Sequence, residues 1–407
     1  MANILYLVHR LPYPPNKGDK VRSYHLLRHL LQSHRVFLGT FIDDPDDEEH
    51  VATLQAMCPD LHIERLKPRL AKARSLKGLL SGDALSLAYY ERSGMHRWVQ
   101  QTLAQHPIDA SVVFSSVMAQ YAQPLLPGVP MLVDFVDVDS AKWSEYAPAH
   151  RWPMSAVYRR EGARLLAYEQ IVAAQARRSF FVTPNETALF LNKAPDAADR
   201  VQSLSNGVDA DFFAPVPNRV NPFPAEEQAV VFTGAMDYWP NIDGVNWFVE
   251  EMLARLRESN PRARFYIVGR NPSPQVQSLA SEHVVVTGTV PDVRPYLQHA
   301  AVVVAPLRVA RGIQNKILEA MAMEQPVITV PSCADAIGAE AAQGLLRADN
   351  AAGFVQSMQR LLAQPDAIKR MGAAARRYVL DHYSWEAHLK GIDTYLPGTS
   401  VPGGVHG

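Results

Sequence analysis

The sequence predicts an α/β protein with two similar domains, each built around a mainly parallel sheet. Its 407 residues are 47% hydrophobic and 20% charged, which provides apolar side chains for more than one core. Short apolar runs of strand length alternate with amphipathic segments of helix length. A proline-rich stretch interrupts this alternation near the middle of the chain, and the alternation then begins again. The alternation predicts open sheets with helices on both faces, and its restart predicts two such sheets.

Ten segments rich in Val, Ile and Phe are the predicted strands. They lack the clean alternation of apolar and polar residues that a half-exposed strand shows, so both faces of each sheet are expected to be covered. The strands of the first domain span residues 4–9, 35–41, 108–114, 131–135 and 179–182. Those of the second domain span residues 229–233, 264–268, 284–287, 301–305 and 327–330.

Turn and proline signals mark the boundary between the domains. Residues 205–209 (SNGVD) indicate a turn, and prolines follow at positions 215, 217, 222 and 224. Prolines at this density cannot continue a helix or a central strand. We therefore predict a first domain of residues 1–207 and a linker of residues 208–228. Low-complexity sequence is confined to residues 397–407, where a disordered tail is expected.

Composition and charge argue against several classes of function. Lys and Arg number 40 against 41 acidic residues, so no global positive field would hold the chain on nucleic acid. Cys58 and Cys333 are far apart and form neither a disulfide framework nor a zinc-ligand cluster. The apolar run 4–8 is too short for a secretory signal, and run 300–307 is far below the ~18 residues that span a bilayer. We therefore expect a cytoplasmic protein.

Residues 64–82 form a basic segment with leucines at roughly helical spacing. Such a segment is either a helix that lies on an anionic membrane surface or an ordinary solvated helix. The arginine-rich segment 154–178 leaves the same two interpretations open. A peripheral position on the inner face of the cytoplasmic membrane is one of the two expectations.

Three loops follow predicted strands at their carboxyl ends, where open α/β sheets bind ligands. The first is residues 9–22 (HRLPYPPNKGDKVR). Its prolines stiffen it, and Gly18 lets a ligand approach the backbone before a helix N-terminus that suits an anion. The G-x-G-x-x-G spacing of a dinucleotide site is absent. The alternative is a rigid structural loop.

The second loop is residues 233–241 (TGAMDYWPN), in which Gly234 and the helix that opens at Pro240 leave room for a diphosphate. The third, residues 311–328 (RGIQNKILEAMAMEQPVI), places Lys316 and Glu319 three residues apart on one helix face. The cation suits a phosphate, and the carboxylate suits a pair of sugar hydroxyls. If this segment stood alone, an i,i+3 surface ion pair would be the preferred interpretation.

The segment 312–328 resembles the donor-site motif of retaining glycosyltransferases of family 4. That family has the GT-B fold, in which two Rossmann-like domains face each other across a cleft. Residues 11–22 resemble the family's acceptor-side loop, and residues 205–213 resemble its N-G-V-D-x-x-x-F crossover between domains. Segments 12–20 and 311–322 are similar to sugar transferases associated with PEP-CTERM/exosortase exopolysaccharide loci.

The resemblance also implies a domain order and roles for individual residues. A nucleotide-sugar-binding domain would span residues 229–383, and a helix of residues 384–396, beginning near Trp385, would cross back to the first domain. Glu319 matches the glutamate that binds the nucleotide ribose, and Lys316 matches a basic position facing the donor phosphates. The expected donor-binding residues are Gly234, Asn241, Gly312, Asn315, Lys316 and Glu319. The expected acceptor-binding residues are Lys17, Gly18 and Arg22.

Two departures from the family pattern stand out. The first glutamate of the family's E-x7-E motif falls on Arg311, a charge reversal, so Arg311 either contacts a donor with a carboxylate or serves a phosphate. The family's histidine near a strand end of the first domain has no counterpart, and the equivalent region is residues 134–143 (DFVDVDSAKW). We expect Asp137 or Asp139 to orient the acceptor hydroxyl there, rather than to bind a metal. The expected catalytic residues are Lys316, Arg311, Asp137 and Asp139.

These features predict a metal-independent glycosyltransferase of the hexosyl type. It would move a sugar from a nucleotide-sugar donor to a carbohydrate or lipid-linked acceptor in exopolysaccharide or cell-surface polysaccharide synthesis. No cofactor is expected, because the nucleotide-sugar is a substrate. Two alternatives stay open: a nucleotide-sugar epimerase, which would isomerise the sugar without an acceptor, and a non-catalytic nucleotide-sugar-binding protein, which would bind without turnover.

Overall fold

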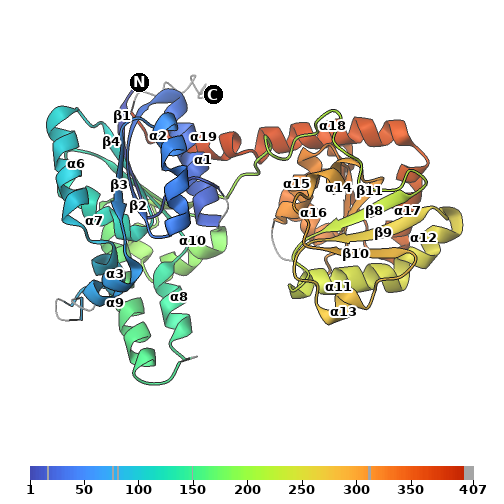
Figure 1. Cartoon of the computed structure of the whole chain (residues 1–407), viewed down its shortest axis with the longest axis horizontal. Helices are drawn as coiled ribbons and strands as arrows, with labels where there is room; N and C mark the ends of the chain where they lie inside the picture. The colour runs from blue at the N-terminus through green and yellow to red at the C-terminus, as the bar shows by residue number, and fades with distance from the viewer. Residues whose placement is uncertain (16–17, 76–77, 80–81, 149, 310–312, 398–407) are drawn as a thin grey trace. The chain divides into compact units, whose positions relative to one another are not determined.

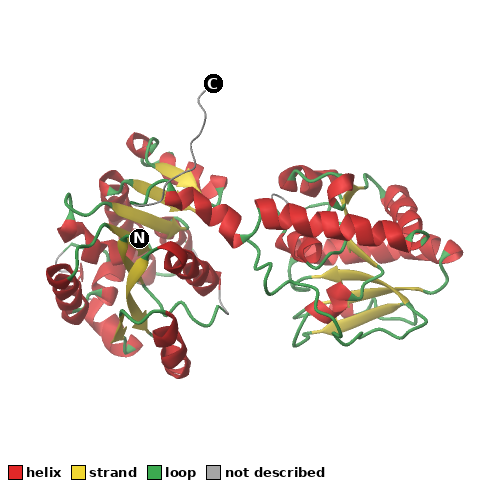
Figure 2. Ribbon diagram, turned by 90° about the horizontal axis from the view of Figure 1, so that it is seen from above, coloured by secondary structure: helices red, strands yellow, loops and turns green. Residues whose placement is uncertain are grey.

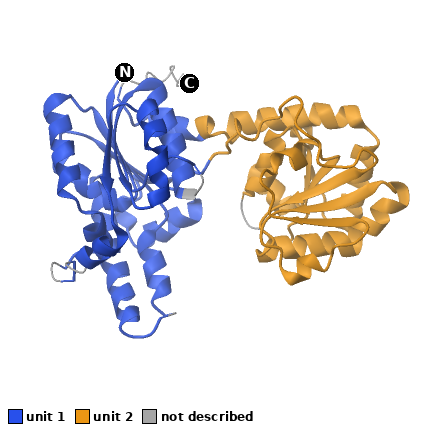
Figure 3. Cartoon of the chain, viewed as in Figure 1, with its two compact units in different colours: residues 1–206, 388–407 blue, residues 207–387 orange. Residues whose placement is uncertain are grey.

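The computed structural model describes residues 1–15, 18–75, 78–79, 82–148, 150–309 and 313–397 (Figure 1). The chain forms two compact units (Figure 3). Unit 1 comprises Met1–Asn206 and His388–Gly407, and unit 2 comprises Gly207–Ala387. The stretch 208–228, expected as a linker, thus belongs to unit 2, where Phe223 is buried in the core. Most of the expected tail, residues 398–407, lies outside the described residues.

Over its described residues, unit 1 contains a parallel sheet of seven strands in the order β3-β2-β1-β4-β5-β6-β7. The strands are β1 (Asn3–Val8), β2 (Arg35–Ile42), β3 (Leu61–Arg65), β4 (Ala110–Phe114), β5 (Met131–Val136), β6 (Arg178–Phe181) and β7 (Val201–Ser203). The helices of unit 1 are α1 (Gly18–Ser33), α2 (Val51–Met57), α3 (Pro68–Ser75), α5 (Leu85–Tyr90), α6 (Ser93–Gln105), α7 (Ala119–Ala122), α8 (Asp139–Tyr146), α9 (Met154–Gln175) and α10 (Pro184–Leu191). Short 3₁₀ turns are η1 (Pro45–His50), η2 (Ser116–Met118), η3 (Gln123–Leu125) and η4 (Pro195–Ala197).

Unit 2 contains, within its described part, a parallel sheet of six strands in the order β10-β9-β8-β11-β12-β13. The strands are β8 (Gln228–Thr233), β9 (Ala263–Val268), β10 (Val284–Gly288), β11 (Val302–Ala305), β12 (Val327–Thr329) and β13 (Leu345–Arg347). The helices are α11 (Trp239–Phe248), α12 (Ala254–Ser259), α13 (Pro274–Gln277), α14 (Arg294–Gln298), α15 (Asn315–Ala322), α16 (Pro331–Ile337), α17 (Ala351–Leu362) and α18 (Pro365–His382). A π-helical segment, η5 (Val249–Leu253), joins α11 to α12, and η6 (Ala341–Gln343) precedes β13.

The last helix, α19 (Trp385–Asp393), begins in unit 2 and ends in unit 1. Its end is held by unit 1 side chains: His29 Nε2 lies 2.8 Å from Asp393 Oδ1. Farther along, the guanidinium of Arg178 lies 4.6 Å from the ring centroid of Tyr395. Residues 388–397 therefore pack with the first unit of the chain.

All ten predicted strands are present, and the α/β class is confirmed. Three further strands, β3, β7 and β13, are edge strands of their sheets. They were missed because they do not show a buried strand's apolar run: β7 and β13 have only three residues each, and β3 is partly exposed along its length. The basic segment 64–82 begins inside β3, so its helix starts only at Pro68.

Each sheet lies between layers of helices (Figure 2). The central strands are buried on both faces; Ile4, Leu5 and Leu7 of β1 have no exposed area. In each sheet the chain first builds outward on one side and then returns to the other side of the first strand. The strand order therefore reverses between β1 and β4 in unit 1, and between β8 and β11 in unit 2. Ligands of such sheets bind at the carboxyl ends of the strands beside this reversal.

Within the described residues, no helix has both the length and the apolar character to cross a bilayer.

Candidate functional site

The reversal point of unit 2 holds four of the predicted donor-binding residues: Gly234, Asn241, Lys316 and Glu319. Gly234 directly follows β8, and Lys316 is in the first turn of α15. The Lys316 Nζ donates a hydrogen bond to Asn241 Oδ1 and lies 4.6 Å from the ring centroid of Phe232. A Cβ atom on Gly234 would lie 2.9 Å from this Nζ and 2.7 Å from Asn241 Nδ2. Glycine at 234 is therefore what lets the backbone, the amide and the amine approach each other.

Asn241 is fixed before any ligand arrives. Pro240 occupies the first turn of α11, and the Asn241 side chain one position later is 4% exposed. Its Nδ2 donates to the carbonyl of Ala235 at 2.8 Å, which orients Oδ1 toward Lys316. The amine is thus held beside the β8 strand end and the start of α11, where backbone N–H groups favour an anion.

Burial perturbs both ionisable groups on α15. It lowers the pKa of Lys316 from 10.5 to about 8, although the charge of Glu319 opposes this change. It raises the pKa of Glu319 from 4.5 to about 7, against the influence of Lys316. Each side chain is held partly away from water without full compensation by its neighbour. Such a pair is a candidate for binding a charged or hydroxyl-rich ligand.

The other predicted residues of unit 2 are placed differently. Asn315 begins α15 and is exposed. Arg311 and Gly312 lie outside the described residues. Arg308, a cation between β11 and α15, pairs with Asp243 at 2.7 Å and lies 4.9 Å from the ring centroid of Trp247.

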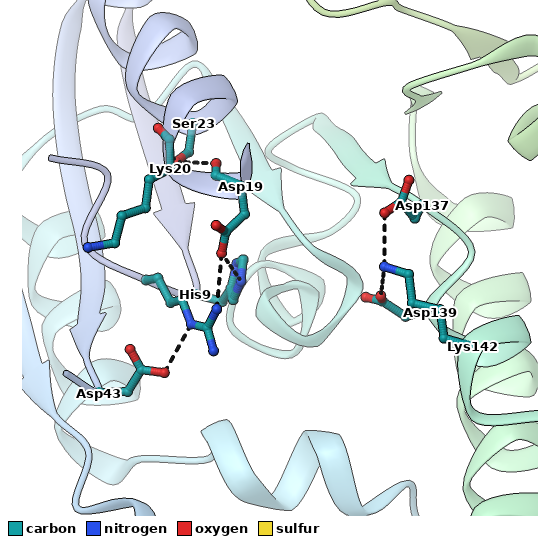
Figure 4. Close-up of polar contacts among 9 residues, drawn as sticks. His9, Asp19, Lys20, Ser23, Asp43, Asp137, Asp139 and Lys142 are labelled. Atoms are coloured by element: carbon teal, nitrogen blue, oxygen red, sulfur yellow. Dashed lines mark hydrogen bonds and ion pairs between the residues drawn. The ribbon is translucent and has the colours of Figure 1, made fainter. Parts of the chain in front are cut away.

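The reversal point of unit 1 holds a pocket of about 300 Å³ (Figure 4). It lies at the carboxyl ends of β1, β4 and β5, and is lined by His9, Arg10, Asp19, Phe114, Ser115, Phe135, Val136, Asp137, Asp139 and Lys142. Ser115 and Val136, at the ends of β4 and β5, have positive φ angles of 73° and 68°. Backbone strain of this kind concentrates at ligand-binding sites, because the surrounding structure must hold it in place.

One side of this pocket is a chain of ion pairs around Arg10. Arg10 Nη1 lies 3.2 Å from Asp19 Oδ2, and its Nε donates to Asp43 at 3.0 Å. His9 stacks on Phe114, and its Nε2 lies 3.6 Å from Asp19 Oδ2. The contact with His9, supported by the charge of Arg10, holds the pKa of Asp19 below its usual range.

The opposite side carries Asp137 and Asp139. Lys142 Nζ donates to Asp137 at 2.9 Å and to Asp139 at 3.1 Å (Figure 4). Although burial of the amine opposes the change, the charges of Asp139 and Asp137 raise the pKa of Lys142 above its ordinary value. Both carboxylates are about one-third exposed, at 34% and 35%, and both line the pocket.

The third carboxylate of this segment, Asp134, does not join them. It is 2% exposed and accepts a hydrogen bond from Arg22 Nε at 2.7 Å. β5 ends at Val136, and its positive φ angle turns the chain, so the three aspartates do not share a face. Over the described residues, no group of three or more His, Cys, Asp or Glu side chains could hold a metal ion.

The structure describes two of the three predicted acceptor-binding residues. Gly18 begins α1, and Lys17 lies outside the described residues. Arg22 is fully buried and links Asp134 to Asn206 Oδ1, at 2.9 Å from the latter. Arg22 Nε and Nη1 thus contact residues of unit 1, and a role of Arg22 toward an acceptor stays a prediction.

The sequence analysis placed His9, Arg10 and Asp19 in a ligand-binding loop and Lys142 in the segment 134–143, but it gave none of these four pocket residues a role. His9 lies directly after β1, and β1 is one of the two strands at the reversal point. Its position at a strand end was the available signal, because that is where such sheets bind ligands. A family histidine was sought near residues 134–143, while a different strand end supplies one here. Asp19 and Lys142 are brought to the pocket by helices, which strand positions do not predict.

One comparison with known proteins is a match to a family model within unit 2. Residues 227–364 match the family described as "Glycosyl transferases group 1". A curated relative from Xenopus tropicalis, "Glycosyltransferase 1 domain-containing protein 1", is 27% identical over 168 residues, which are 39% of this chain. The matched region covers 48% of that relative, so the chain spans about half the length of the curated relative it matches.

Several solved structures share the architecture of the whole chain. Sucrose-phosphate synthase from Thermosynechococcus elongatus is 17% identical, with 97% of this chain and 98% of that one covered, at a TM-score of 0.56. Anabaena HepE in complex with UDP-glucose is 14% identical, with 97% and 99% covered, at 0.55. WaaG, a glycosyltransferase involved in lipopolysaccharide biosynthesis, is 17% identical, with 97% and 100% covered, at 0.52.

The fold is therefore that of GT-B glycosyltransferase structures, with parallel sheets of seven and six strands over the described residues. The match to the glycosyl transferases group 1 family lies within unit 2. The matched segment contains Gly234, Asn241, Lys316 and Glu319.

Proposed function

We propose that the chain is a glycosyltransferase that moves a sugar from a nucleotide-sugar donor to a carbohydrate or lipid-linked acceptor. The observation that carries this proposal is the cluster of Lys316, Asn241 and Gly234 at the reversal point of the unit that matches the group 1 family. The amine, the glycine loop and the start of α11 converge at one point, where a diphosphate has both a cation and backbone donors.

On the donor side, Lys316 stabilises the leaving group. Breaking the bond between sugar and phosphate develops negative charge on the nucleoside diphosphate, and a positioned cation stabilises that charge. With a pKa of about 8, Lys316 is mostly protonated at neutral pH, and a bound diphosphate would raise its pKa further. Glu319, in the next turn, accepts hydrogen bonds from the ribose hydroxyls. The UDP-glucose bound to Anabaena HepE supports a UDP-sugar as the first donor to test.

On the acceptor side, the pocket of unit 1 binds the sugar that receives the transfer. Asp137 and Asp139 orient the attacking hydroxyl by accepting its hydrogen bond, and Lys142 fixes the two carboxylates. His9 adds a second polar group on the opposite wall, positioned by Asp19. Arg311 remains proposed as a contact to the donor, with Gly312 and Asn315 beside it, and Lys17 and Gly18 as contacts to the acceptor.

The proposal includes finer statements that rest on the sequence resemblance to family 4. Transfer is of the hexosyl type, retains the anomeric configuration and needs no metal, because the cation role falls to Lys316. The product belongs to exopolysaccharide or cell-surface polysaccharide synthesis, in a system of the PEP-CTERM/exosortase kind. The protein works in the cytoplasm, at the inner surface of the cytoplasmic membrane, where the basic residues of α3 face anionic lipid.

The test is release of nucleoside diphosphate by the purified chain across a panel of UDP-, GDP- and ADP-sugars, with and without acceptor sugars. We expect release with one donor class, stimulated by acceptor and unaffected by EDTA, and a product whose anomeric configuration matches that of the donor. Isomerised sugar without acceptor would instead indicate an epimerase. Silence with every donor would contradict the proposal.

A further inference from the structure

Unit 1 contains a second pocket, of about 600 Å³, beside the first. Arg10 lines both of them, so the two pockets share a wall. The second pocket lies among α3, α5, α8 and α9, and is lined by Arg10, Lys72, Ser75, Leu79, Leu85, Ser86, Tyr89, Tyr90, Trp143, Met154, Val157, Tyr158 and Glu161. Its size falls within the range of about 300–1,000 Å³ that is usual for small-molecule sites.

The walls of this pocket are mainly aromatic and aliphatic. Trp143 and Tyr158 pack together with ring centroids 5.4 Å apart, and Tyr89 and Tyr90 do so at 4.9 Å. These rings are half-buried, and each therefore keeps an accessible face. Val157 lies in the lining on α9, next to Tyr158.

Three polar residues of the lining, Glu161, Ser86 and Ser75, are already paired. Glu161 is 2% exposed, and its two oxygens accept from the backbone N–H groups of Leu85 and Ser86, at 2.6 and 2.9 Å. The Ser86 hydroxyl donates to Glu161 at 2.7 Å. Ser75 Oγ donates to the Lys72 carbonyl at 2.7 Å. These three residues have little hydrogen-bonding capacity left for a ligand, and the aromatic and aliphatic walls of the pocket favour an apolar occupant.

Exposed and charged side chains at the edge of the second pocket indicate the source of its occupant. Leu79 and Met154 line the pocket and are 43% and 42% exposed, and the neighbouring Trp152 is 82% exposed. Lys72 of α3 is an exposed cation on the lining, which complements an anionic linker such as a phosphate. Figure 1 shows the α8–α9 hairpin projecting from unit 1. Exposed aromatic and aliphatic side chains beside basic residues are typical of surfaces that contact anionic lipid.

We propose that this second pocket binds the hydrocarbon chain of a phosphate-linked lipid acceptor, whose sugar then lies in the adjoining pocket with His9 and Asp139. The inference rests on the proposed function for the identity of that sugar acceptor, but the chain site itself is a property of unit 1. The shared wall at Arg10 places the two halves of such an acceptor side by side. Lys72 contacts the phosphate, and the Trp143 and Tyr158 rings contact the chain.

The test is calorimetric titration of the full chain with hexyl, octyl and decyl phosphate, each below its critical micelle concentration. We expect the dissociation constant to fall by up to about fourfold for each added methylene until the pocket is filled. Val157→Phe fills the pocket and should weaken decyl phosphate binding at least tenfold. Ala163→Phe, at an exposed position of α9 outside the lining, should leave it within twofold.

A second pair of variants needs no change in a packed position. Leu79→Asp at the pocket edge should weaken decyl phosphate binding, while Leu70→Asp, exposed on α3 outside the lining, should not. Equal affinity for hexyl and decyl phosphate, or undiminished binding by a folded Val157→Phe or Leu79→Asp variant, would overturn the inference. Binding of the donor nucleotide is measured in parallel: if the donor binds and alkyl phosphates do not, only this inference fails. If alkyl phosphates bind and no donor does, only the proposed function fails.

Discussion

Both units have a polar site at the point where the strand order of their sheet reverses, but the surroundings act on the charged side chains of the two sites in opposite ways. In unit 2, burial moves the pKa values of Lys316 and Glu319 toward neutrality. In unit 1, contacts keep the charges in place: His9 and Arg10 hold the pKa of Asp19 below its usual range. The same strand-end geometry thus yields one incompletely compensated pair and one paired network.

This difference teaches what each site is ready to bind. A buried ammonium without a full counter-charge becomes better stabilised when an anion arrives, so the unit 2 site suits a diphosphate. In the unit 1 pocket the charged side chains are already paired with each other, so they need no ligand to compensate their charges. They present hydrogen-bond acceptors and donors in fixed positions, which suits a neutral hydroxyl that must be oriented. Four measurements break or sharpen this comparison.

The largest effect is expected from Lys316→Ala. Loss of a cation aimed at the leaving group should lower turnover by about 10²–10³-fold, as removal of one preorganised stabilising group does. Steady-state release of nucleoside diphosphate measures it. Lys369→Ala, which removes an exposed lysine from α18 of the same unit, is the matched control and should leave turnover unchanged. Equal turnover in the two variants would remove Lys316 from the mechanism.

His9→Asn is expected to act on the acceptor side alone. It should lower turnover by about 10²-fold through loss of acceptor positioning, while the dissociation constant of the donor stays unchanged. His62→Asn, in β3 of the same unit and outside the pocket, serves as the control. A change in donor affinity in His9→Asn would mean that the two sites are not separate in function.

Glu319→Gln tests whether the carboxylate charge of Glu319 is incompletely compensated, through its effect on the free energy of unfolding. The folded-state pKa of Glu319 is raised from 4.5 to about 7, so the folded wild type loses stability as pH rises from about 4.5 to about 7. The glutamine variant cannot ionise and should gain about 1–3 kcal/mol relative to wild type between pH 5 and pH 8. Urea denaturation at both pH values measures this gain. Glu258→Gln, at an exposed site in α12, should not show it, and an equal gain there would contradict the burial argument.

The smallest effect is expected from Asp137→Asn. Asp139 would still pair with Lys142 and remain as an acceptor for the hydroxyl, so turnover should fall by less than about fivefold, or about 1 kcal/mol of activation free energy. The double change of Asp137 and Asp139 to Asn should cost more than the sum of the two single changes in activation free energy. Simple additivity in acceptor kinetics would instead show that the carboxylates do not share one hydroxyl.

The sequence was sufficient for ten of the thirteen described strands and for the residue cluster at the unit 2 reversal point, but not for the unit 1 pocket. Gly234, Asn241, Lys316 and Glu319 belong to loops and helix starts next to strongly apolar strands, whose order follows from the α/β alternation. The unit 1 pocket depends on tertiary contacts instead. The pairing of His9 with Asp19, and of Arg10 with Asp43, joins separate elements whose relative positions no local pattern specifies. Asp134 shows the same limit, because a single positive φ angle at Val136 separates it from the next two aspartates.

A crystal structure of the full chain with a bound nucleoside diphosphate tests the central claim most directly. The account predicts β-phosphate oxygens within hydrogen-bond distance of Lys316 Nζ, beside Gly234, and both ribose hydroxyls on the Glu319 carboxylate. A nucleotide bound elsewhere, with the Lys316–Asn241 hydrogen bond intact and Glu319 untouched, would contradict it.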